Sequence, residues 1–283
     1  MKKLILTTES VADLPKDIVE KYQIEIIHMH VILDGKAYLE TEITVEDIFS
    51  YYEEKKKAPT TTAKNAQEYT IFFSKIREQH PDSIIIHIGY TSKASGSFQS
   101  AMIAARDFED LYLIDTLNAT GGLALIVQYA AEQLAENPAI EPQELIRRIE
   151  HIIPKTKLAF IPDTLEFLKA GGRLGNVAFI GGSLLKIKPC KEIKAGKLAS
   201  IKKYRGQMAN VAEKLLSDFF EQYKLDRAKL NLIYSVGLAD SIREKMEEFA
   251  QREGFKDIRW IKAGPTISTH AGPGCFGVAG IEL

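Results

Sequence analysis

Blocks of hydrophobic residues alternate with polar turns through the first half of the chain. Short apolar runs rich in Ile, Leu and Val predict buried strands over residues 4–6, 83–88 and 111–114. Polar stretches follow these runs, and two of them lead into helical patterns that extend to residue 106 and over residues 123–134. An order of strand, polar turn and helix is typical of βαβ units around a parallel sheet. Ligands bind such sheets beyond the carboxyl ends of the strands, which is where these polar turns lie.

Shorter sequence signals predict further helices and a strand between these units. Pro15 suits the first turn of a helix, where its missing N–H group has no intrahelical partner. Residues 24–32 are rich in β-branched side chains and predict one strand, which ends at the turn signal Asp34-Gly35. Thr44 can cap a helix that has acidic residues in its first turn.

The second half of the chain has a different pattern. A connecting helix over residues 144–151 ends before Pro154, and a strand follows over residues 158–161. Residues 187–193 and 198–204 flank Ala195-Gly196 and predict an antiparallel hairpin. Two amphipathic helices over residues 209–223 and 240–252 enclose a strand over residues 230–235. At about 100–150 residues per domain, we expect an N-terminal α/β domain over residues 1–155 and a C-terminal α+β domain over residues 156–283.

Composition and charge narrow the class of protein. Lys and Arg total 37 against 38 Asp and Glu, so no global charge attracts nucleic acid or an anionic membrane. Cys190 and Cys275 lie far apart and form no CxxC pair, which argues against a zinc knuckle or a redox motif. The first apolar run is too short for a signal peptide, and none approaches the ~18 residues of a membrane span. We therefore expect a cytoplasmic protein without stable membrane insertion.

Two short motifs suggest cofactors but lack the necessary context. Residues 272–277 spell GxGxxG, yet the chain ends at Leu283, which leaves no room for the helix and acidic residue of a dinucleotide site. We expect these glycines to shape a tight loop. His28 and His30 would share one face of a strand, but a metal usually needs three or four ligands and no third is nearby in the sequence.

Hydroxyl groups mark a candidate anion site. Ser95-Gly96 stands before a helix, where free backbone N–H groups bind anions. Ser92 or Ser95 with His270 and Asp115 could instead form a hydrolase triad, although the nucleophile elbow GxSxG is absent. A second hydroxyl cluster, in the sequence Pro59-Thr60-Thr61-Thr62, either caps a helix that begins near Asn65 or faces the same anion.

Residues 186–205 form a basic stretch, with eight Lys and Arg residues and one acid, Glu192. Such a run is either a solvated face or a docking surface for an acidic or phosphate-bearing partner. Tyr204 is its one aromatic residue, so binding of single-stranded nucleic acid is not expected.

Six segments together resemble the DegV family of bacterial fatty-acid-binding proteins. They occur in the family's order and span almost the whole chain. Thr7–Leu14 is similar to TDSxxDL, although Thr8 and Glu9 depart from it, and residues 59–62 are similar to PTTS with Thr62 in place of Ser. The other segments are residues 91–101 (SSxLSGTYQSA), 165–174 (LxxLxxGGRI), 184–189 (LLxIKP) and 270–274 (HxGPG).

The resemblance implies a two-domain α/β protein that holds a long-chain fatty acid between its domains. It implies no catalytic residue, metal or cofactor of the chain's own. A separate ATP-binding subunit of a fatty acid kinase would phosphorylate the carboxyl group that this chain presents. The family's motifs assign the carboxylate to Thr61 or Thr62 and to Ser95-Gly96, with His270 nearby and Arg205 extending the polar network. The alternatives are a serine hydrolase acting on acyl esters through Ser95 and His270, and a lipid-sensing interaction protein.

Overall fold

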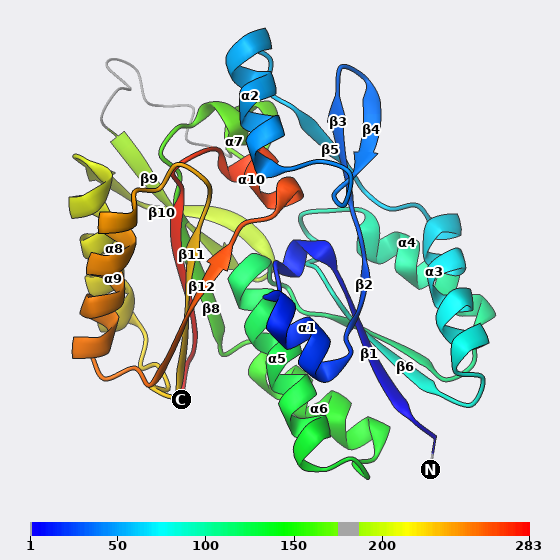
Figure 1. Cartoon of the computed structure of the whole chain (residues 1–283). Coiled ribbons are helices and arrows are strands. Elements are labelled where there is room, and N and C mark those ends of the chain that lie inside the picture. Colours follow the sequence, from blue (N-terminus) through cyan, green and yellow to red (C-terminus); the bar gives the residue numbers. More distant parts are fainter. Residues whose placement is uncertain (1, 175–186) are drawn as a thin grey trace.

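A four-stranded parallel sheet organises the N-terminal half (Figure 1). The computed structural model describes residues 2–174 and 187–283. The sheet has the order β2-β1-β6-β7, with β1 (Leu4–Glu9), β2 (Glu25–Ile27), β6 (Ile84–Gly89) and β7 (Leu111–Asp115). Helices α3 (Ala66–Gln79) and α4 (Ser97–Ala104) cover one face, and α1 (Lys16–Tyr22), α5 (Thr120–Glu136) and α6 (Pro142–Ile152) cover the other.

The alternation of side chains along the strands explains why both faces are covered. Ile5 and Ile85 pack under α3 and α4, whereas their neighbours Leu6 and Ile86 pack under α5 and α6. Successive residues of a strand point to opposite faces, so an unbroken apolar run gives each face its own core.

A six-stranded mixed sheet organises the C-terminal half. Its order is β10-β9-β8-β13-β11-β12, with β8 (Thr156–Ile161), β9 (Ile187–Lys194), β10 (Lys197–Arg205), β11 (Lys229–Tyr234), β12 (Asp257–Lys262) and β13 (Phe276–Ile281). Helices α8 (Met208–Gln222) and α9 (Asp240–Arg252) cover one face. Helix α5 packs on the other face through Leu125, which contacts a cluster containing Leu158 and Ile233. Helix α5 therefore lies between the two large sheets.

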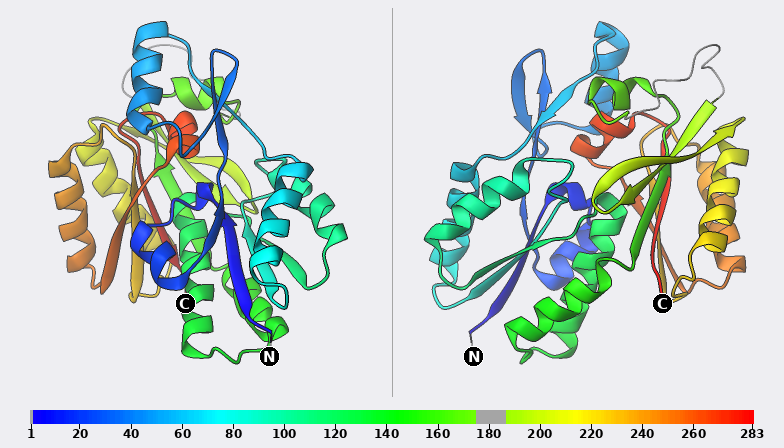
Figure 2. Two further views of the ribbon diagram at one scale, coloured as in Figure 1. Left: turned by 45° about the vertical axis from the view of Figure 1, so that its right-hand side comes forward. Right: turned by 180° about the vertical axis from the view of Figure 1, so that it is seen from behind.

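A small third sheet stands at one end of the molecule (Figure 2). It has the order β4-β3-β5, with β3 (His30–Leu33), β4 (Lys36–Leu39) and β5 (Thr60–Thr62). Near it lie α2 (Val45–Lys55), α7 (Glu166–Ala170) and α10 (Pro265–Ala271). Val31, Phe49 and Phe167 share one buried cluster, so the C-terminal half contributes to this core as well. Two 3₁₀ turns, η1 (Ser10–Ala12) and η2 (Ala105–Asp107), complete the described elements.

Most predicted elements are confirmed, and one is wrong. The strand expected over residues 24–32 is two strands, because the chain leaves the parallel sheet after Ile27 and joins the small sheet at His30. The periodicity is the same on both sides of the break, so it carries no mark of a change of sheet. The division at residues 155 and 156 falls between α6 and β8, and two autonomous domains remain a proposal.

Candidate functional site

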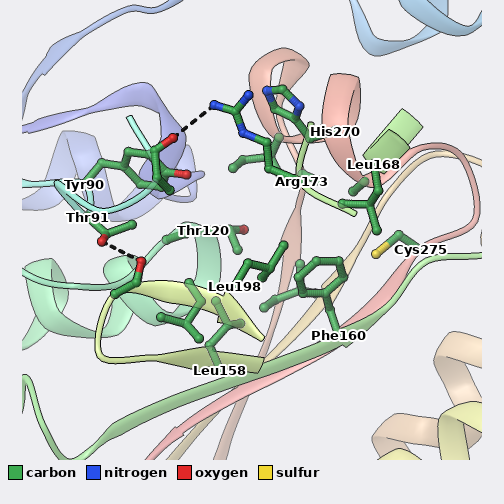
Figure 3. Close-up of a pocket in the computed structure, with 18 of the residues that line it drawn as sticks. Tyr90, Thr91, Thr120, Leu158, Phe160, Leu168, Arg173, Leu198, His270 and Cys275 are labelled. Carbon is green, nitrogen blue, oxygen red and sulfur yellow. Dashed lines mark hydrogen bonds between the residues drawn. The ribbon is translucent and has the colours of Figure 1, made fainter. Parts of the chain in front are cut away.

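Two adjoining pockets lie where the two large sheets and the small sheet meet. One, here called the apolar pocket, has a cavity volume of about 90 Å³ (Figure 3). Its wall includes Leu158, Phe160, Leu168, Ile193, Leu198 and Ile233. The other, here called the hydroxyl pocket, has a volume of about 110 Å³ and is lined by Thr61, Thr62, Ser95, Gly96, Ser97 and Thr266, among others. Both pockets share Tyr90, Ala94, Arg173, Ile267 and His270, so they adjoin as the apolar part and the polar part of one candidate site.

The strands of the six-stranded sheet build the apolar pocket by alternation. Leu158 and Phe160 point into it from β8, whereas Ala159 between them packs in the core that contains α8. The tip of the β9–β10 hairpin closes one side, because Thr91 Oγ1 donates a hydrogen bond of 2.8 Å to the carbonyl of Gly196. A Cβ at Gly196 would lie 2.6 Å from Thr91 Oγ1, so glycine is required for this close approach.

The hydroxyl pocket brings together the predicted residues from distant parts of the sequence. Thr61 lies in the middle of β5, and its Oγ1 is 2.9 Å from Nε2 of His270. Ser95 lies just before α4, where its Oγ accepts a hydrogen bond of 3.2 Å from the backbone N–H of Ser97. Gly96 is the N-cap of α4 and makes no side-chain cap. Hydroxyl groups and a helix N-terminus therefore converge on one small space, a combination that suits an anion.

His270 is neutral at physiological pH. Burial, with a smaller contribution from the charge of Arg173, lowers the pKa of His270 to about 4. Its Nδ1 is buried and has no hydrogen-bond partner within residues 2–174 and 187–283. When Nε2 carries the proton and donates to Thr61, the threonine hydroxyl can donate to a third group. The pair is therefore able to offer a hydrogen bond to an anion in the pocket.

Arg173 lies at the site, although the family motifs did not assign it there. Its guanidinium donates to the carbonyls of Ala94, at 3.0 Å, and Gly171, and it borders both pockets. The turn before it requires glycine twice. Gly172 has a φ of +69°, and a Cβ at Gly171 would lie 2.2 Å from His270 Nδ1. The sequence Gly171-Gly172-Arg173 therefore indicates a turn that places the Arg173 guanidinium beside the two pockets.

A buried network under the site fixes the position of Tyr90. Glu9 is fully buried and accepts hydrogen bonds from the Tyr90 backbone N–H, at 2.7 Å, and from the Tyr69 hydroxyl, at 2.8 Å. Burial by itself raises the pKa of Glu9. His87 and these hydrogen bonds together lower the pKa by more than burial raises it, so the net pKa lies below the usual value. Burial raises the pKa of Tyr90 to about 12. Tyr90 is therefore a neutral wall residue.

Arg205 is not brought to this cluster. It is exposed at the last position of β10 and lines neither pocket. At ~3.3 Å per strand residue, the seven steps from Leu198 to Arg205 span roughly 23 Å. Strand β10 thus places Arg205 at the far end of the hairpin from the site. Lys186, the first residue of the predicted basic stretch, and residues 184–185 of the LLxIKP segment lie outside the described residues.

The hydrogen bonds around Ser95 do not assemble the hydrolase triad. Ser95 Oγ donates to Ser97 Oγ at 3.2 Å, whereas His270 pairs with Thr61. Asp115 Oδ1 accepts from the backbone N–H groups of Ser92 and Leu117 instead of from an imidazole. These contacts hold a loop and do not relay a proton.

The two cofactor-like motifs form structural features. His30 lies 3.6 Å from Glu68 Oε1 and 3.4 Å from Lys64 Nζ, and no cluster of three or more metal-ligating side chains occurs among the described residues. Gly272 and Gly274, at φ values of +74° and +68°, form the turn from α10 to β13. A strand follows this GxGxxG segment, so the expected tight loop is confirmed. Within the part of the chain that the structure describes, no helix is long and apolar enough to cross a bilayer.

Comparisons with known proteins cover almost the whole chain. A family model described as "Uncharacterised protein, DegV family" matches residues 3–283. A DegV domain-containing protein of Caldanaerobacter subterraneus subsp. tengcongensis is 32% identical over 287 residues, which cover 98% of each chain. A Thermotoga maritima protein named fatty acid-binding protein is 27% identical, with 99% of this chain and 98% of that one covered. A solved Thermus thermophilus structure, described as fatty acid binding of a DegV family protein, has a TM-score of 0.88 at 25% identity and covers 99% and 100% of the two chains.

Proposed function

This chain belongs to the DegV family, and on that premise we propose that it binds one long-chain fatty acid. The acyl chain occupies the apolar pocket, and the carboxylate lies in the hydroxyl pocket. The fatty acid-binding name of the Thermotoga maritima relative and the description of the Thermus thermophilus structure support this assignment.

One observation carries the proposal: an apolar pocket and a hydroxyl-lined pocket share a wall of five residues and form one site. Burial of each methylene contributes ~0.8 kcal/mol, so a long tail supplies most of the affinity. A carboxylate removed from water needs hydrogen-bond donors, because an unpaired buried charge is costly. Only a molecule with one anionic end and a long apolar body uses both halves of this site.

We assign the head-group contacts to residues of the hydroxyl pocket. Thr61 and Thr62 present hydroxyl groups from β5, and Ser95 and Gly96 present a hydroxyl and a helix N-terminus from α4. His270 acts through its hydrogen bond with Thr61. Arg173, which borders the site, takes the role that the family motifs suggested for Arg205.

The fatty acid is the ligand of a carrier, and a separate ATP-binding kinase subunit converts its carboxyl group to an acyl phosphate. The hydrogen bonds around Ser95 favour this role over the serine hydrolase, since they form no relay to His270. A cytoplasmic location belongs to the same proposal and agrees with Cys190 and Cys275, which are both buried, free thiols.

Mass spectrometry of the purified protein tests the proposal. We expect the native mass to exceed the polypeptide mass by one fatty acid, which denaturation and lipid extraction release. A bare polypeptide that also fails to bind added palmitate or oleate would contradict fatty acid binding.

Two further assays separate the alternatives. Turnover of an activated acyl ester, or an acyl adduct on Ser95, would favour the hydrolase. Fatty acid binding without acyl phosphate formation in the presence of the kinase subunit and ATP would favour a lipid-sensing protein.

A further inference from the structure

The N-terminus of helix α10 is held by two carboxylates from the other half of the chain. Its N-cap, Gly264, has no side chain to cap the helix. Asp13 Oδ1 accepts the backbone N–H of Gly264 at 2.9 Å, and Glu40 Oε1 accepts that of Thr266 at 2.6 Å. Both carboxylates therefore satisfy N–H groups that a helix leaves free at its first turn.

Of the two acids, Glu40 is buried and Asp13 is half-buried. Glu40 is 9% exposed, and its Oε2 has no hydrogen-bond partner among the described residues. Asp13 has a left-handed φ of 51°, and its Oδ2 accepts a hydrogen bond of 2.6 Å from Thr120, the first residue of α5. Burial raises the pKa of Asp13 well above its usual value, and the charge of Glu40 adds to that effect. Desolvated carboxylates are costly unless compensated, and the hydrogen bonds from Thr120 and Gly264 offset the burial of Asp13 only in part.

The opposite end of the same helix carries His270. From Thr266 to His270 the helix rises roughly 6 Å, which is about one turn. The fit at that end is tight, because Gly171 packs against the imidazole and Thr61 bonds its Nε2. A shift at the start of α10 is thus transmitted to His270 within one turn of rigid backbone.

We propose that Asp13 and Glu40 are positioning residues, which hold α10 so that His270 and Thr61 meet a bound carboxylate. This inference rests on the proposed function of the site. It also gives a role to Asp13 of the segment Thr7–Leu14, which the head-group assignment does not use. Neither acid lines the apolar pocket or the hydroxyl pocket.

The test compares two ligands that share one tail. Dissociation constants for palmitate and methyl palmitate are measured for the parent and for Asp13→Ala, Glu40→Ala and Glu40→Gln. Palmitate binding to the two alanine variants should weaken roughly tenfold or more, the effect of losing one hydrogen bond to a charged group. Methyl palmitate binding to Glu40→Ala should stay within about threefold, because neither Glu40 nor its partner Thr266 lines the apolar pocket. Asp13→Ala also frees the hydroxyl of Thr120, which lines that pocket, so the comparison of the two ligands is decided on Glu40→Ala. Glu40→Gln keeps an acceptor for the Thr266 N–H group and should restore most of the palmitate affinity.

A matched control is Glu42→Gln, which removes a charge two residues away. Glu42 is exposed and accepts the local backbone N–H of Leu39 at 2.9 Å, so both ligands should bind to this variant as to the parent. Equal weakening of palmitate and methyl palmitate in Glu40→Ala would mean that the acid only stabilises the fold. That result, or unchanged binding of both ligands, would overturn the proposal.

A spectroscopic readout separates this inference from the proposed function. The imidazole ¹⁵N shifts of His270 report its hydrogen bond with Thr61 in the lipid-free protein. They should change in Asp13→Ala and Glu40→Ala and stay as in the parent in Glu42→Gln. If the parent bound neither ligand, the proposed function would fail, and the ¹⁵N shifts alone would decide whether the acids position His270. Identical shifts in all variants would refute the positioning role.

Discussion

Replacing Thr61 with valine removes one hydroxyl from the head-group site and changes little else. Valine has nearly the shape of threonine and the same preference for a strand. The lost group is Oγ1, which lies 2.9 Å from Nε2 of His270. The variant therefore loses the hydroxyl that we propose donates to the carboxylate, and it loses the hydrogen-bond partner of the imidazole.

The size of the effect follows from the charge of the ligand. A hydrogen bond to a charged group contributes roughly 1.5–3 kcal/mol. Each 1.4 kcal/mol is tenfold in a dissociation constant, so fatty acid binding to Thr61→Val should weaken by roughly 10- to 150-fold. The tail contacts are unchanged, because Thr61 lines the hydroxyl pocket and not the apolar pocket. Methyl palmitate should consequently bind to the variant almost as it binds to the parent.

Titration of delipidated protein with palmitate measures this difference directly. Thr70→Val is the matched control, since Thr70 Oγ1 donates to the carbonyl of Ala66 within α3 and lines neither pocket. The reasoning is refuted if Thr61→Val binds palmitate as tightly as Thr70→Val does. It is also refuted if palmitate and methyl palmitate lose the same affinity.

Three other outcomes are expected. Ser95→Ala should weaken fatty acid binding or slow acyl phosphate formation. Ser100 lines neither pocket, so Ser100→Ala should change neither quantity. If the two variants behave alike, Ser95 only caps the helix. Because the folded pKa of His270 is about 4 and the unfolded value ~6.5, the unfolded state binds more protons between these values and stability falls as pH drops through that window. In His270→Gln, melting temperatures should depend less on pH there, and an unchanged slope would remove His270 as the cause. Lys203→Met should slow acyl phosphate formation at low salt and leave lipid binding intact. Lys202→Met should have less effect, because Lys202 pairs with Asp218. Equal rates of the parent and both variants would mean that the basic stretch is a solvated face.

Local signals predicted most helices well, because residues that cap a helix can be recognised in the sequence. Thr44 and Asp47 form a reciprocal capping box at the start of α2, as the hydroxyl and the acidic turn suggested. The Ala195-Gly196 turn has positive φ at both residues, the geometry that a two-residue hairpin requires. The elements that the sequence did not reveal include β12 and β13, which pair with distant strands of the C-terminal sheet, and α10, whose start is held by Asp13 and Glu40 of the other half. Helix α10 in particular has no side-chain cap of its own.

The polar residues of the site were predictable only as separate clusters. Ser95-Gly96 before a helix and the three threonines of β5 each suggested a site for an anion or a cap, and periodicity could not choose between these roles. The structure places both clusters on one pocket, and His270 joins Thr61 across 209 positions of sequence. Contacts of that separation leave no trace in local patterns. The resemblance to a family supplied what local chemistry could not.

The misplacement of the arginine shows how strand geometry limits inference from a charge run. Arg205 stands at the end of a stretch rich in lysine, and the family resemblance implied that it extends the polar network around the carboxylate. A bulge between Ser200 and Lys202 changes which face of β10 the following residues occupy, and the strand then leads away from the hairpin tip that closes the site. Arg173 follows a two-glycine turn and needs no run of charge, since Gly171 of that turn packs against His270 and its carbonyl accepts a hydrogen bond from the Arg173 guanidinium. In this chain, a single arginine that follows a tight turn, Arg173, is therefore a better indication of an anion site than the basic strand that ends at Arg205.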